Sequence, residues 1–450
     1  MTGKANGVLP DDVSRNGQSE SWLIFCDLPT GQEVQPWLVA ATAAVNTLVA
    51  PADDGPSATC TTAVGASLFD KTGLVAMRPV DLGAPLPALV PPEPHDILFY
   101  VFALNDATVA DFLRSLSAIS SSVTFHIERG YQRKDGRETF GQRDGLRNIP
   151  TADREAVAFI GCDQPDEPVW AHGGSYLAYV KIQQNVGTWN ALTEDAQATV
   201  VGRRADGSRV DLPVGTDPRT EPPLTSAPAA PPALNAHIRK AAPGDAANDP
   251  VRIFRRGTPY IEATVGGAIS EGLQFVSYQT SMDTFNTMLG RWMLNPSFPQ
   301  VGSGVDALFN SAAALTTFIK GGTYFAVPHD DRFLGAGMFD PVAVDTAQVH
   351  IKLTVTDNVG TPDPLASLAS ATFQVTDGTG TPVGASFTTD AAGHAVSSPL
   401  PINTALIVTE VAAPTGSSVA VPQALELAGC RDLVQKWVNT RTANPGQYGG

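Results

Sequence analysis

Three short segments of this chain hold residue types that could do redox chemistry around a single metal centre. The segment NAHIRKA carries His237, GRETFGQRDGLRNIP carries Asp144 in a turn between glycines, and RIFRRGTPY carries Arg255 and Arg256 after an apolar run. A neutral imidazole is a strong axial donor to iron when a porphyrin supplies the other ligands. A carboxylate is suited to moving a proton, and a guanidinium to holding a developing negative charge. Each segment is short, so the interpretation depends on their combination and order.

The other histidines and the cysteines argue against a metal site built from ligands that are close in sequence. The chain has seven histidines, and no two of them form an HxH or HxxxH pair. Its cysteines are far apart, so we expect free buried thiols in place of a zinc cluster or a disulfide framework at Cys26, Cys60, Cys162 and Cys430. A single histidine beside a haem remains open, and a loop histidine with no ligand is the alternative.

The charge balance excludes two classes of partner. The 450 residues include 29 Lys+Arg and 45 Asp+Glu, which gives a net charge of −16. Phosphate backbones and anionic membrane surfaces attract clustered Lys and Arg, so we expect no nucleic-acid partner and no membrane partner. No apolar run has the roughly 18 to 20 residues of a spanning helix, and the polar start of the chain lacks the apolar core of a secretory signal. These features predict a cytoplasmic protein, and export by a route without such a signal stays open.

The elements that must position these residues follow an α+β pattern. Short apolar runs bounded by Pro and Gly predict strands, and apolar residues three and four positions apart predict helices. The first part of the chain gives strand, helix, strand, strand and helix over residues 21–28, 34–48, 61–67, 96–103 and 108–120. This order is typical of a split βαβ, ferredoxin-like module.

A second group of elements repeats this order, and a third region differs from both. Strands are predicted over 173–184, 271–280 and 323–327, with helices over 189–201 and 282–292. From about residue 346 short runs alternate between polar and apolar residues, as in a small antiparallel sandwich. We therefore predict a flexible N-terminus over 1–20, ferredoxin-like modules over 21–170 and 171–345, and a β-sandwich-like module over 346–450.

In the order in which they occur along the chain, the segments that carry Asp144, His237 and Arg255 resemble motifs of the dye-decolorizing peroxidases. That family carries a GxxDG motif, an HxR segment with the proximal histidine, and an RRG motif near the end of a strand, here at Asp144, His237 and Arg255. Arg255 follows His237 by 255 − 237 = 18 residues, a compact spacing of the kind seen in that family. The resemblance covers about residues 21–341.

The resemblance implies a haem peroxidase that reduces hydrogen peroxide and oxidises bulky dyes, phenolic compounds or lignin-like compounds. His237 would be the proximal ligand of the iron in haem b. Asp144 would take a proton from peroxide and return it to the leaving oxygen, and Arg255 would stabilise the negative charge on that oxygen. Turnover is expected to be best in mildly acidic buffer. Two departures, Gln142 in place of the usual Phe and an additional Ile149, concern the shape of the Asp144 loop.

Further residues match positions that have roles in the family, and their roles are implied in the same way. Asp306 would accept a hydrogen bond from His237 and give its ring more anionic character. Arg239 would pair with a haem propionate, and Leu273 and Phe275 would line the distal side. Bulky reductants would be oxidised through aromatic residues at the surface, for which the candidates are Tyr260, Tyr278, Trp292 and Tyr324.

The C-terminal module resembles the prealbumin-like B repeats of bacterial surface adhesins, through FQVTDGTGTPV, TTDAAGHAV and IVTEVAAPTG. In that family a Lys, a Glu and a late Asn can form an internal isopeptide bond. Lys352 and Glu410 match the first two positions, and no Asn follows closely after the turn at Gly416. The resemblance therefore implies a structural or interaction module without a cross-link.

Two other functions stay open from the sequence. One is that of a related ferredoxin-like haem protein, such as a chlorite dismutase or a deferrochelatase-like protein, although Asp144 and Arg255 together favour peroxide cleavage. The other is that of a non-catalytic haem-binding interaction protein in which the β module acts. Mn(II) is a further candidate reductant, because it prefers carboxylate ligands and Glu262 and Glu271 lie near the distal motifs in sequence. It is the lesser candidate, because the spacing of these two residues is not diagnostic.

Overall fold

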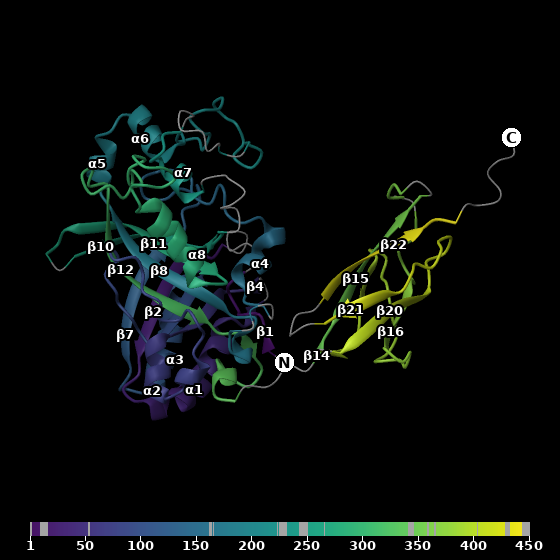
Figure 1. Cartoon of the computed structure of the whole chain (residues 1–450). Coiled ribbons are helices and arrows are strands. Elements are labelled where there is room, and N and C mark those ends of the chain that lie inside the picture. Colours follow the sequence, from purple (N-terminus) through teal and green to yellow (C-terminus); the bar gives the residue numbers. More distant parts are fainter. Residues whose placement is uncertain are drawn as a thin grey trace. The chain divides into compact units, whose positions relative to one another are not determined.

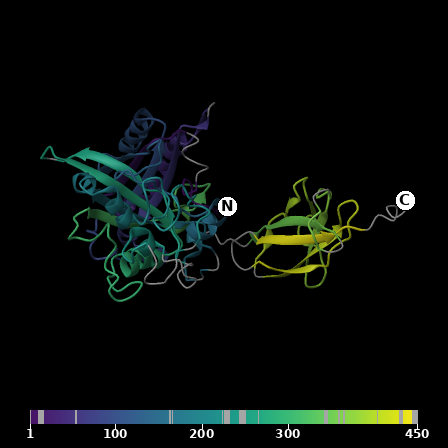
Figure 2. The ribbon, with the colours of Figure 1, turned by 90° about the horizontal axis from the view of Figure 1, so that it is seen from above.

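The computed structural model shows two compact units, which Figures 1 and 2 present in two views. The first comprises Met1–Ile160 and Asp166–Pro341, and the second Gly161–Pro165 and Val342–Gly450. The structure describes residues 2–9, 17–52, 55–161, 164, 166–222, 224, 232–242, 251–264, 266–340, 346–357, 360–363, 366–402, 404–427 and 433–442. Cys26 and Cys60 are buried free thiols, whereas Cys162 and Cys430 lie outside the described residues. Within these ranges, no helix has both the length and the apolar composition needed to cross a bilayer.

The first half of the first unit is a ferredoxin-like module. Its elements are β2 (Glu20–Asp27), α1 (Val34–Leu48), β5 (Ala58–Gly65), β6 (Ile97–Ala103), α3 (Asp106–Ile119) and β7 (Thr124–Tyr131). The strands lie in the order β5-β6-β2-β7, and each neighbouring pair is antiparallel. Helix α1 buries one side, which includes Trp37 and Ala41, because its apolar residues recur at helical spacing. Asn105 caps α3 by accepting a 3.1 Å hydrogen bond from the N–H of Thr108.

The second half of this unit repeats that order with a different sequence. Its elements are β8 (Ser175–Gln184), α5 (Val186–Asn190), α6 (Glu194–Val201), α7 (His237–Ala241), β9 (Phe254–Arg255), β10 (Thr258–Ala263), β11 (Ile269–Gln279), α8 (Met282–Asn286), the π-helical η5 (Thr287–Met293) and β12 (Thr316–Ala326). The main strands lie in the order β10-β11-β8-β12, which matches the order in the first half, and β9 pairs with β11. The predicted α+β class with two ferredoxin-like modules is confirmed.

The two modules share one sheet and form one compact unit. Strand β12 pairs with β5, with Tyr324 opposite Gly65, and this pairing joins the strands into a nine-stranded sheet. The hydroxyl oxygens of Ser21 in β2 and Thr258 in β10 lie 2.7 Å apart. The sheet is therefore curved, because strands near opposite ends of its order come into contact.

This curvature gives the sheet a helix-covered face and an inner face. Val180 and Phe275 lie on the helix-covered face and pack with Met282 of α8 in one core cluster. Tyr179 and Tyr278 belong to a separate cluster on the inner face. Because successive residues of a strand point to opposite faces, the register decides which side chains meet.

Residues 2–9 pack against this unit, so the predicted flexible N-terminus over 1–20 is wrong for that segment. Strand β1 (Thr2–Gly3) pairs with β13 (His329–Asp330), and Ala5 and Val8 are buried with the inner-face cluster. Apolar side chains that cover a sheet face order the segment, whereas residues 10–16 lie outside the described ranges. The short elements that complete the unit are β3 (Pro51–Ala52), β4 (Gly55–Pro56), α2 (Ala66–Thr72), α4 (Arg154–Ala158), η1 (Gly31–Glu33), η2 (Val75–Met77), η3 (Thr151–Asp153), η4 (Val169–Ala171) and η6 (Ala336–Met338).

The second unit is built from short strands around one apolar core. These are β14 (Thr346–Ala347), β15 (Val349–Thr356), β16 (Thr372–Asp377), β17 (Phe387–Thr388), β18 (His394–Val396), β19 (Leu400–Pro401), β20 (Ala405–Ala412), β21 (Gln423–Glu426) and β22 (Leu433–Thr440). They form sheets in the orders β18-β15-β22 and β17-β16-β20-β21, with β14 paired to β19. Phe373 and Trp437 meet edge to face at 5.1 Å between the two larger sheets.

The Lys and Glu that the adhesin resemblance singles out do not meet in this unit. Lys352 is exposed on β15, whereas Glu410 is buried. The Glu410 carboxylate accepts hydrogen bonds from Nδ2 of Asn439 at 2.6 Å and from Nε1 of Trp437 at 3.2 Å. The buried carboxylate is therefore satisfied by two side chains of the last strand and not by a lysine.

Candidate functional site

His237 and Asp306 form a hydrogen-bonded pair at the start of α7. Nδ1 of His237 lies 2.9 Å from Oδ2 of Asp306, whose side chain is fully buried. The backbone fixes this acid, because its N–H donates to the carbonyl of Met293 at 2.8 Å and its Oδ1 accepts from the N–H of Leu308 at 2.9 Å. With Nδ1 engaged, Nε2 is the nitrogen left to bind a metal, and the carboxylate fixes the ring and raises its basicity.

Two phenylalanines join His237 to the helix-covered face of the sheet. The rings of His237 and Phe309 lie 6.3 Å apart, and Phe309 stacks on Phe318 of β12 at 4.9 Å. Phe318 is paired in register with Ile182 of β8, which belongs to that face. The imidazole, whose side chain is 26% exposed, therefore lies beside apolar rings and keeps an accessible edge.

Asp144 lies in a tight loop that needs glycine at two positions. Gly141 and Gly145 have φ values of +80° and +71°, in the left-handed region that side chains disfavour. Asp144 is exposed, its N–H donates to the carbonyl of Gly136 at 3.0 Å, and its Oδ1 accepts from the N–H of Gly145 at 2.6 Å. The spacing of the GxxDG motif therefore reflects a loop geometry that presents the carboxylate outward.

Asn148 ties the Asp144 loop to the strand that carries the arginines. Its Nδ2 donates to the carbonyl of Arg255 at 2.8 Å, and its Oδ1 accepts from the N–H of Arg255 at 3.1 Å. One amide thus satisfies both backbone groups of a residue that is 107 positions away in sequence. The additional Ile149 does not prevent this connection, and the loop lies beside β9.

The two arginines of the RRG segment face opposite sides of the sheet. Arg255 is paired in register with Ser277 of β11, lies on the helix-covered face and is partly exposed. Arg256 turns to the inner face, where its guanidinium lies 4.3 Å from the ring of Phe102 and donates to the carbonyl of Gly7. Burial lowers the pKa of Arg256. Arg255 is therefore the arginine on the helix-covered face, whereas the guanidinium of Arg256 is engaged on the inner face.

Strand β11 adds apolar and polar side chains to the face of Arg255. Leu273, Phe275 and Ser277 alternate along the strand, so all three lie on that face. Leu273 and Phe275 are partly exposed, and the ring of Phe275 lies 6.1 Å from that of Phe285 in α8. Ser277 Oγ is buried without a hydrogen-bond partner among the described residues. An unpaired buried hydroxyl is uncommon, and here it adjoins the candidate distal arginine.

These residues fit an iron porphyrin. His237 offers a nitrogen to the metal, with the other nitrogen held by a buried acid. The rings beside it and the β11 side chains supply apolar surface for a flat macrocycle. Arg255 and the unpaired Ser277 hydroxyl supply polar groups on the same sheet face. The donor set of one imidazole suits an iron whose other ligands come from the macrocycle.

The two basic residues after His237 are buried and anchor α7. Arg239 donates through Nη1 to the carbonyl of Pro232 at 2.6 Å, and burial lowers its pKa. Lys240 donates through Nζ to the carbonyls of Trp292 and Asn295 at 3.0 and 2.7 Å, and burial lowers its pKa as well. Lys240 thus holds α7 against the end of η5, a role that the sequence analysis does not identify.

Glu138 supports the Asp144 loop from inside. Its carboxylate accepts from the N–H groups of Phe140 and Gln142 at 2.9 and 2.8 Å, and from Nε2 of Gln184 at 2.6 Å. Burial raises the pKa of Glu138 above its ordinary value, the hydrogen bonds oppose this shift, and the negative charge of Asp144 adds to it. The loop therefore contains a carboxyl group, that of Glu138, whose pKa is raised by its surroundings.

The four aromatic residues predicted to pass electrons at the surface are buried, so their predicted location is wrong. Tyr260, Tyr278 and Tyr324 are fully buried, and Trp292 is 4% exposed. Strand alternation directs Tyr278 and Tyr324 to the inner-face core, Nζ of Lys181 lies 4.5 Å from the ring of Tyr260, and Trp292 stacks on Phe298 at 5.4 Å. A bulky reductant therefore cannot touch these rings directly.

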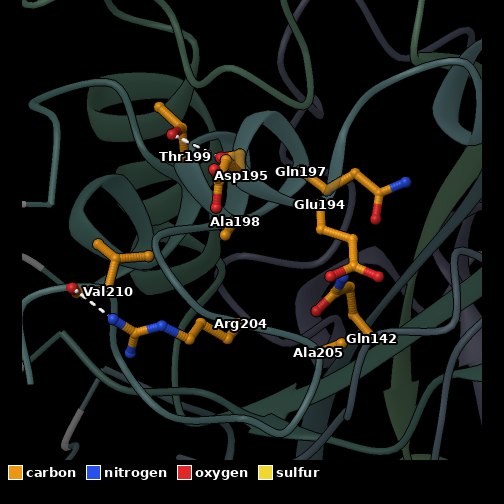
Figure 3. Close-up of a pocket in the computed structure, with 9 residues that line it drawn as sticks. All are labelled: Gln142, Glu194, Asp195, Gln197, Ala198, Thr199, Arg204, Ala205 and Val210. Atoms are coloured by element: carbon orange, nitrogen blue, oxygen red, sulfur yellow. Dashed lines mark hydrogen bonds between the residues drawn. The ribbon is translucent and has the colours of Figure 1, made fainter. Parts of the chain in front are cut away.

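An acidic pocket of about 450 Å³ adjoins the Asp144 loop. Figure 3 shows its lining, which is made of Gln142, Glu194, Asp195, Gln197, Ala198, Thr199, Arg204, Ala205 and Val210. Gln142 belongs to the Asp144 loop, and Glu194 and Asp195 begin α6. Arg204 donates to the carbonyls of Arg209 and Val210 at 2.6 and 2.9 Å, so its guanidinium is hydrogen-bonded to the backbone of its own loop. The pocket can therefore offer carboxylates to a cationic group.

Three residues support the candidate site although no sequence motif predicts their roles: Asn148, Lys240 and Ser277. Asn148 stands four positions after Asp144, and an Asn beside a loop has many uses, so its signal is weak. Lys240 and Ser277 show their roles only through burial and register. The Mn(II) candidate Glu262 has its Oε1 2.7 Å from Nζ of Lys181, so its charge is already paired.

Comparison with known protein sequences supports the same interpretation. Residues 135–331 match the family model described as Dyp-type peroxidase, C-terminal. A relative from Escherichia coli strain K12, named Deferrochelatase, is 31% identical over 248 residues, which cover 50% of this chain and 58% of that protein. A protein of the same name from Shigella sonnei strain Ss046 is 29% identical over the same shares. The chain thus matches less than two thirds of the length of these relatives.

Solved structures share the fold. A DyP-type peroxidase from Streptomyces coelicolor has a TM-score of 0.62 at 22% identity, over 76% of this chain and 96% of that chain. Ferric DtpA from Streptomyces lividans has a TM-score of 0.61 at 22% identity, over 76% and 97%. A DypB variant from Rhodococcus jostii RHA1 in complex with heme has a TM-score of 0.54 at 20% identity, over 72% and 95%. The resemblance to the dye-decolorizing peroxidases is confirmed.

Proposed function

We propose that this chain, which carries a match to the Dyp-type peroxidase C-terminal domain over residues 135–331, is a haem peroxidase that oxidises bulky dyes or phenolic compounds. Hydrogen peroxide would take up two protons and two electrons to give two molecules of water, and two molecules of reductant would each lose one electron. The observation that carries the proposal is the 2.9 Å pair between His237 Nδ1 and the buried Asp306 carboxylate. This pair leaves Nε2 to a metal.

On the proximal side, bound haem b would supply the iron chemistry needed to cleave the oxygen–oxygen bond of peroxide. His237 would hold this iron through Nε2, and Asp306 would keep the ring oriented and basic. Arg239 would pair with a propionate, which its guanidinium suits. Leu273 and Phe275 would line the distal side and limit the water there.

On the distal side, Asp144 and Arg255 would divide the work. The Asp144 carboxylate would accept the proton of one peroxide oxygen and then donate it to the leaving oxygen. The Arg255 guanidinium would stabilise the negative charge that builds on the leaving oxygen. The bridge from Asn148 to Arg255 supports this assignment, because it fixes the loop and the strand against each other.

The test combines spectra with peroxide kinetics on the full-length, haem-supplemented protein. We expect a Soret band that His237→Ala abolishes. Asp144→Asn and Arg255→Leu should retain haem and lower kcat/KM for peroxide by about 10²–10⁴-fold and 10²–10³-fold, with an anthraquinone dye as reductant. Arg252→Leu, which removes an exposed arginine paired with Asp153 at 3.2 Å, is the matched control and should stay near wild type. A wild-type protein without a Soret band would overturn the proposal.

The name of the curated relatives favours a second candidate function, the release of iron from haem. The pair of His237 and Asp306 would serve this reaction too. Iron release involves no cleavage of peroxide, so it does not require the roles proposed for Asp144 and Arg255. The two functions separate in one experiment, in which haem-loaded protein is incubated with a reductant and no peroxide. Growth of metal-free porphyrin fluorescence would favour iron release, and peroxide-dependent dye bleaching without it would favour the peroxidase.

A further inference from the structure

A cluster of two imidazoles and one carboxylate lies on the inner face of the sheet, in its first half. Strands β6, β2 and β7 are neighbours, and Phe25 of β2 is opposite His126 of β7. Asp27 is two residues after Phe25, so its side chain shares a face with that of His126. His95 lies two residues before the start of β6 (Ile97), and its ring lies 4.9 Å from that of Phe25 and 4.7 Å from that of His126.

The potential ligand atoms of this cluster converge. Nδ1 of His95 lies 2.8 Å from Oδ2 of Asp27, and Nε2 of His126 lies 3.5 Å from the same oxygen. One ligand atom from each of the three residues lies within 4.8 Å of the other two. Bond lengths of about 2.0–2.2 Å in a tetrahedral site place ligand atoms roughly 3.3 Å apart. The cluster is therefore close to the size that a transition metal requires.

Glu93 completes the surroundings of His95. Its Oε1 lies 3.3 Å from Nε2 of His95 and 2.9 Å from Nζ of Lys320. The His95 ring thus has a carboxylate at each nitrogen. It can satisfy both with a hydrogen on each nitrogen, or with a hydrogen on Nε2 toward Glu93 and a metal ion on Nδ1. The second arrangement is the carboxylate–histidine–metal geometry common in metal sites.

The neighbouring Asp96 shows how a structural carboxylate differs here. Its Oδ2 accepts from Nζ of Lys71 at 2.6 Å and from the N–H of Leu28 at 2.8 Å, and its Oδ1 accepts from Ser67 Oγ at 2.6 Å. Oδ2 of Asp27, in contrast, faces two imidazoles. A nitrogen of each imidazole can release its proton to solvent and bind a metal ion in its place. Asp96 is therefore part of the scaffold, and Asp27 is the available ligand.

We propose that Asp27, His95 and His126 form a binding site for a divalent transition-metal ion, with Zn²⁺ as the expected occupant. Two imidazoles and a carboxylate suit zinc and copper far better than magnesium or calcium, which prefer oxygen ligands. His95 is 6% exposed, whereas Asp27 and His126 are 32% and 46% exposed. The ion would therefore be held on the buried side by His95 and would keep a position open to water or an exchangeable ligand.

Calorimetric titration with Zn²⁺ of the full-length, haem-loaded protein, after dialysis against a chelator, tests this site. We expect one ion per chain in wild type, and an affinity at least about 10-fold weaker in His126→Ala and Asp27→Asn, because each removes one of the three ligands. His329→Ala is the matched control, since His329 is also an exposed histidine near an aspartate, with Nε2 3.3 Å from Asp331. It should bind Zn²⁺ as wild type does.

A thermal melt gives a second readout that loss of folding cannot imitate. Saturating Zn²⁺ should raise the Tm of wild type and of His329→Ala, because an ion that binds only the folded state stabilises it. It should not raise the Tm of His126→Ala, whose Soret band should equal that of wild type. Equal Zn²⁺ affinity in wild type, His126→Ala and Asp27→Asn would overturn the proposal, as would the absence of binding in wild type.

Discussion

In the proposed haem site, Asp306 would control the charge and orientation of the His237 imidazole. The carboxylate is fully buried and accepts from the ring at 2.9 Å. A neutral amide at this position could keep the ring in place but would remove the negative charge beside it. We expect Asp306→Asn to retain haem, to raise the Fe(III)/Fe(II) potential, and to lower kcat/KM for peroxide by about 10- to 100-fold. Spectroelectrochemistry and stopped-flow kinetics measure both.

The control for this change is Asp283→Asn, which alters an exposed aspartate that pairs with Arg291 at 2.6 Å. It should leave the potential and the peroxide kinetics unchanged. If Asp306→Asn lost activity with an unmoved potential, the acid would have a purely structural role.

Glu138 makes the stability of the Asp144 loop depend on pH. Burial raises its pKa in the folded chain above the ordinary 4.5. Below 4.5 the group is protonated in both the folded and unfolded states, and above the raised pKa the folded state must hold a buried charge. Its contribution to stability is therefore fully present at low pH and is lost as pH rises through the raised pKa. We expect Glu138→Gln to remove this part of the pH dependence.

The measurement compares the free energy of unfolding of wild type and Glu138→Gln from about pH 4 to pH 8, the range in which a raised carboxyl pKa titrates. The difference between the two proteins should shift in favour of Glu138→Gln as pH rises. A difference that is constant over this range would contradict the assignment of the shift to Glu138.

At the scale of elements, the Asp144 loop depends on the left-handed conformation of Gly145. Its φ is +71°, and an added Cβ would meet no atom within 4 Å, so strain comes from the backbone alone. We expect Gly145→Ala to cost about 1–2 kcal/mol of stability and to lower kcat/KM for peroxide, because the Asp144 carboxylate would move.

Gly73 is a matched control for this substitution. It ends α2 with a φ of +73° and equally open surroundings. Gly73→Ala should therefore cost a similar free energy of unfolding and leave the peroxide kinetics unchanged. Equal kinetic losses in both variants would indicate a general effect of stability.

Local patterns predict the elements better than they predict their assembly. The predicted helix over 34–48 coincides with α1, because its apolar residues recur at helical spacing. The pairing of β12 with β5 joins residues far apart in sequence, and no periodicity encodes it. The same limit explains the tyrosines, since alternation places Tyr278 and Tyr324 on one face but does not reveal that the curved sheet encloses it.

The candidate site divides in the same way. Motif spacing predicts that Asp144, His237 and Arg255 act together, because residues of these types occur in the same order in the motifs of the dye-decolorizing peroxidases. Spacing cannot identify Asn148 as the bridge, since its partner is 107 positions away. Nor can it identify the His95 and His126 cluster, because strand pairing and not a local motif brings those rings to 4.7 Å.

In the second unit, Glu410 links the core to the last strand. Its carboxylate accepts from Asn439, from Trp437 and from the N–H of Ala420. Glu410→Ala would leave these buried donors unpaired, so we expect a loss of about 3 kcal/mol in this unit. Hydrogen exchange of peptides from β15 and β22 in the full chain measures the loss. Lys352→Ala, at an exposed site, should change it by less than about 0.5 kcal/mol.

At the scale of the whole molecule, the net charge of −16 bears on which reductants reach the first unit. The pocket beside the Asp144 loop adds Glu194 and Asp195 to this general negative charge. An acidic surface lowers the local concentration of anions and raises that of cations. Anionic dyes should therefore be poorer substrates at neutral pH than their redox chemistry alone implies, and cationic reductants or Mn(II) better ones.

Ionic strength tests this directly, because salt screens exposed charges over about 10 Å at 0.1 M. We expect added salt to raise kcat/KM for an anionic dye by about two- to ten-fold and to lower it for a cationic dye by a similar factor. A neutral phenol is the control and should respond little. Glu194→Gln with Asp195→Asn should reduce both salt effects if the reductants approach through the pocket beside the Asp144 loop. Salt effects of the same sign for both dyes would mean that surface charge does not select the reductant.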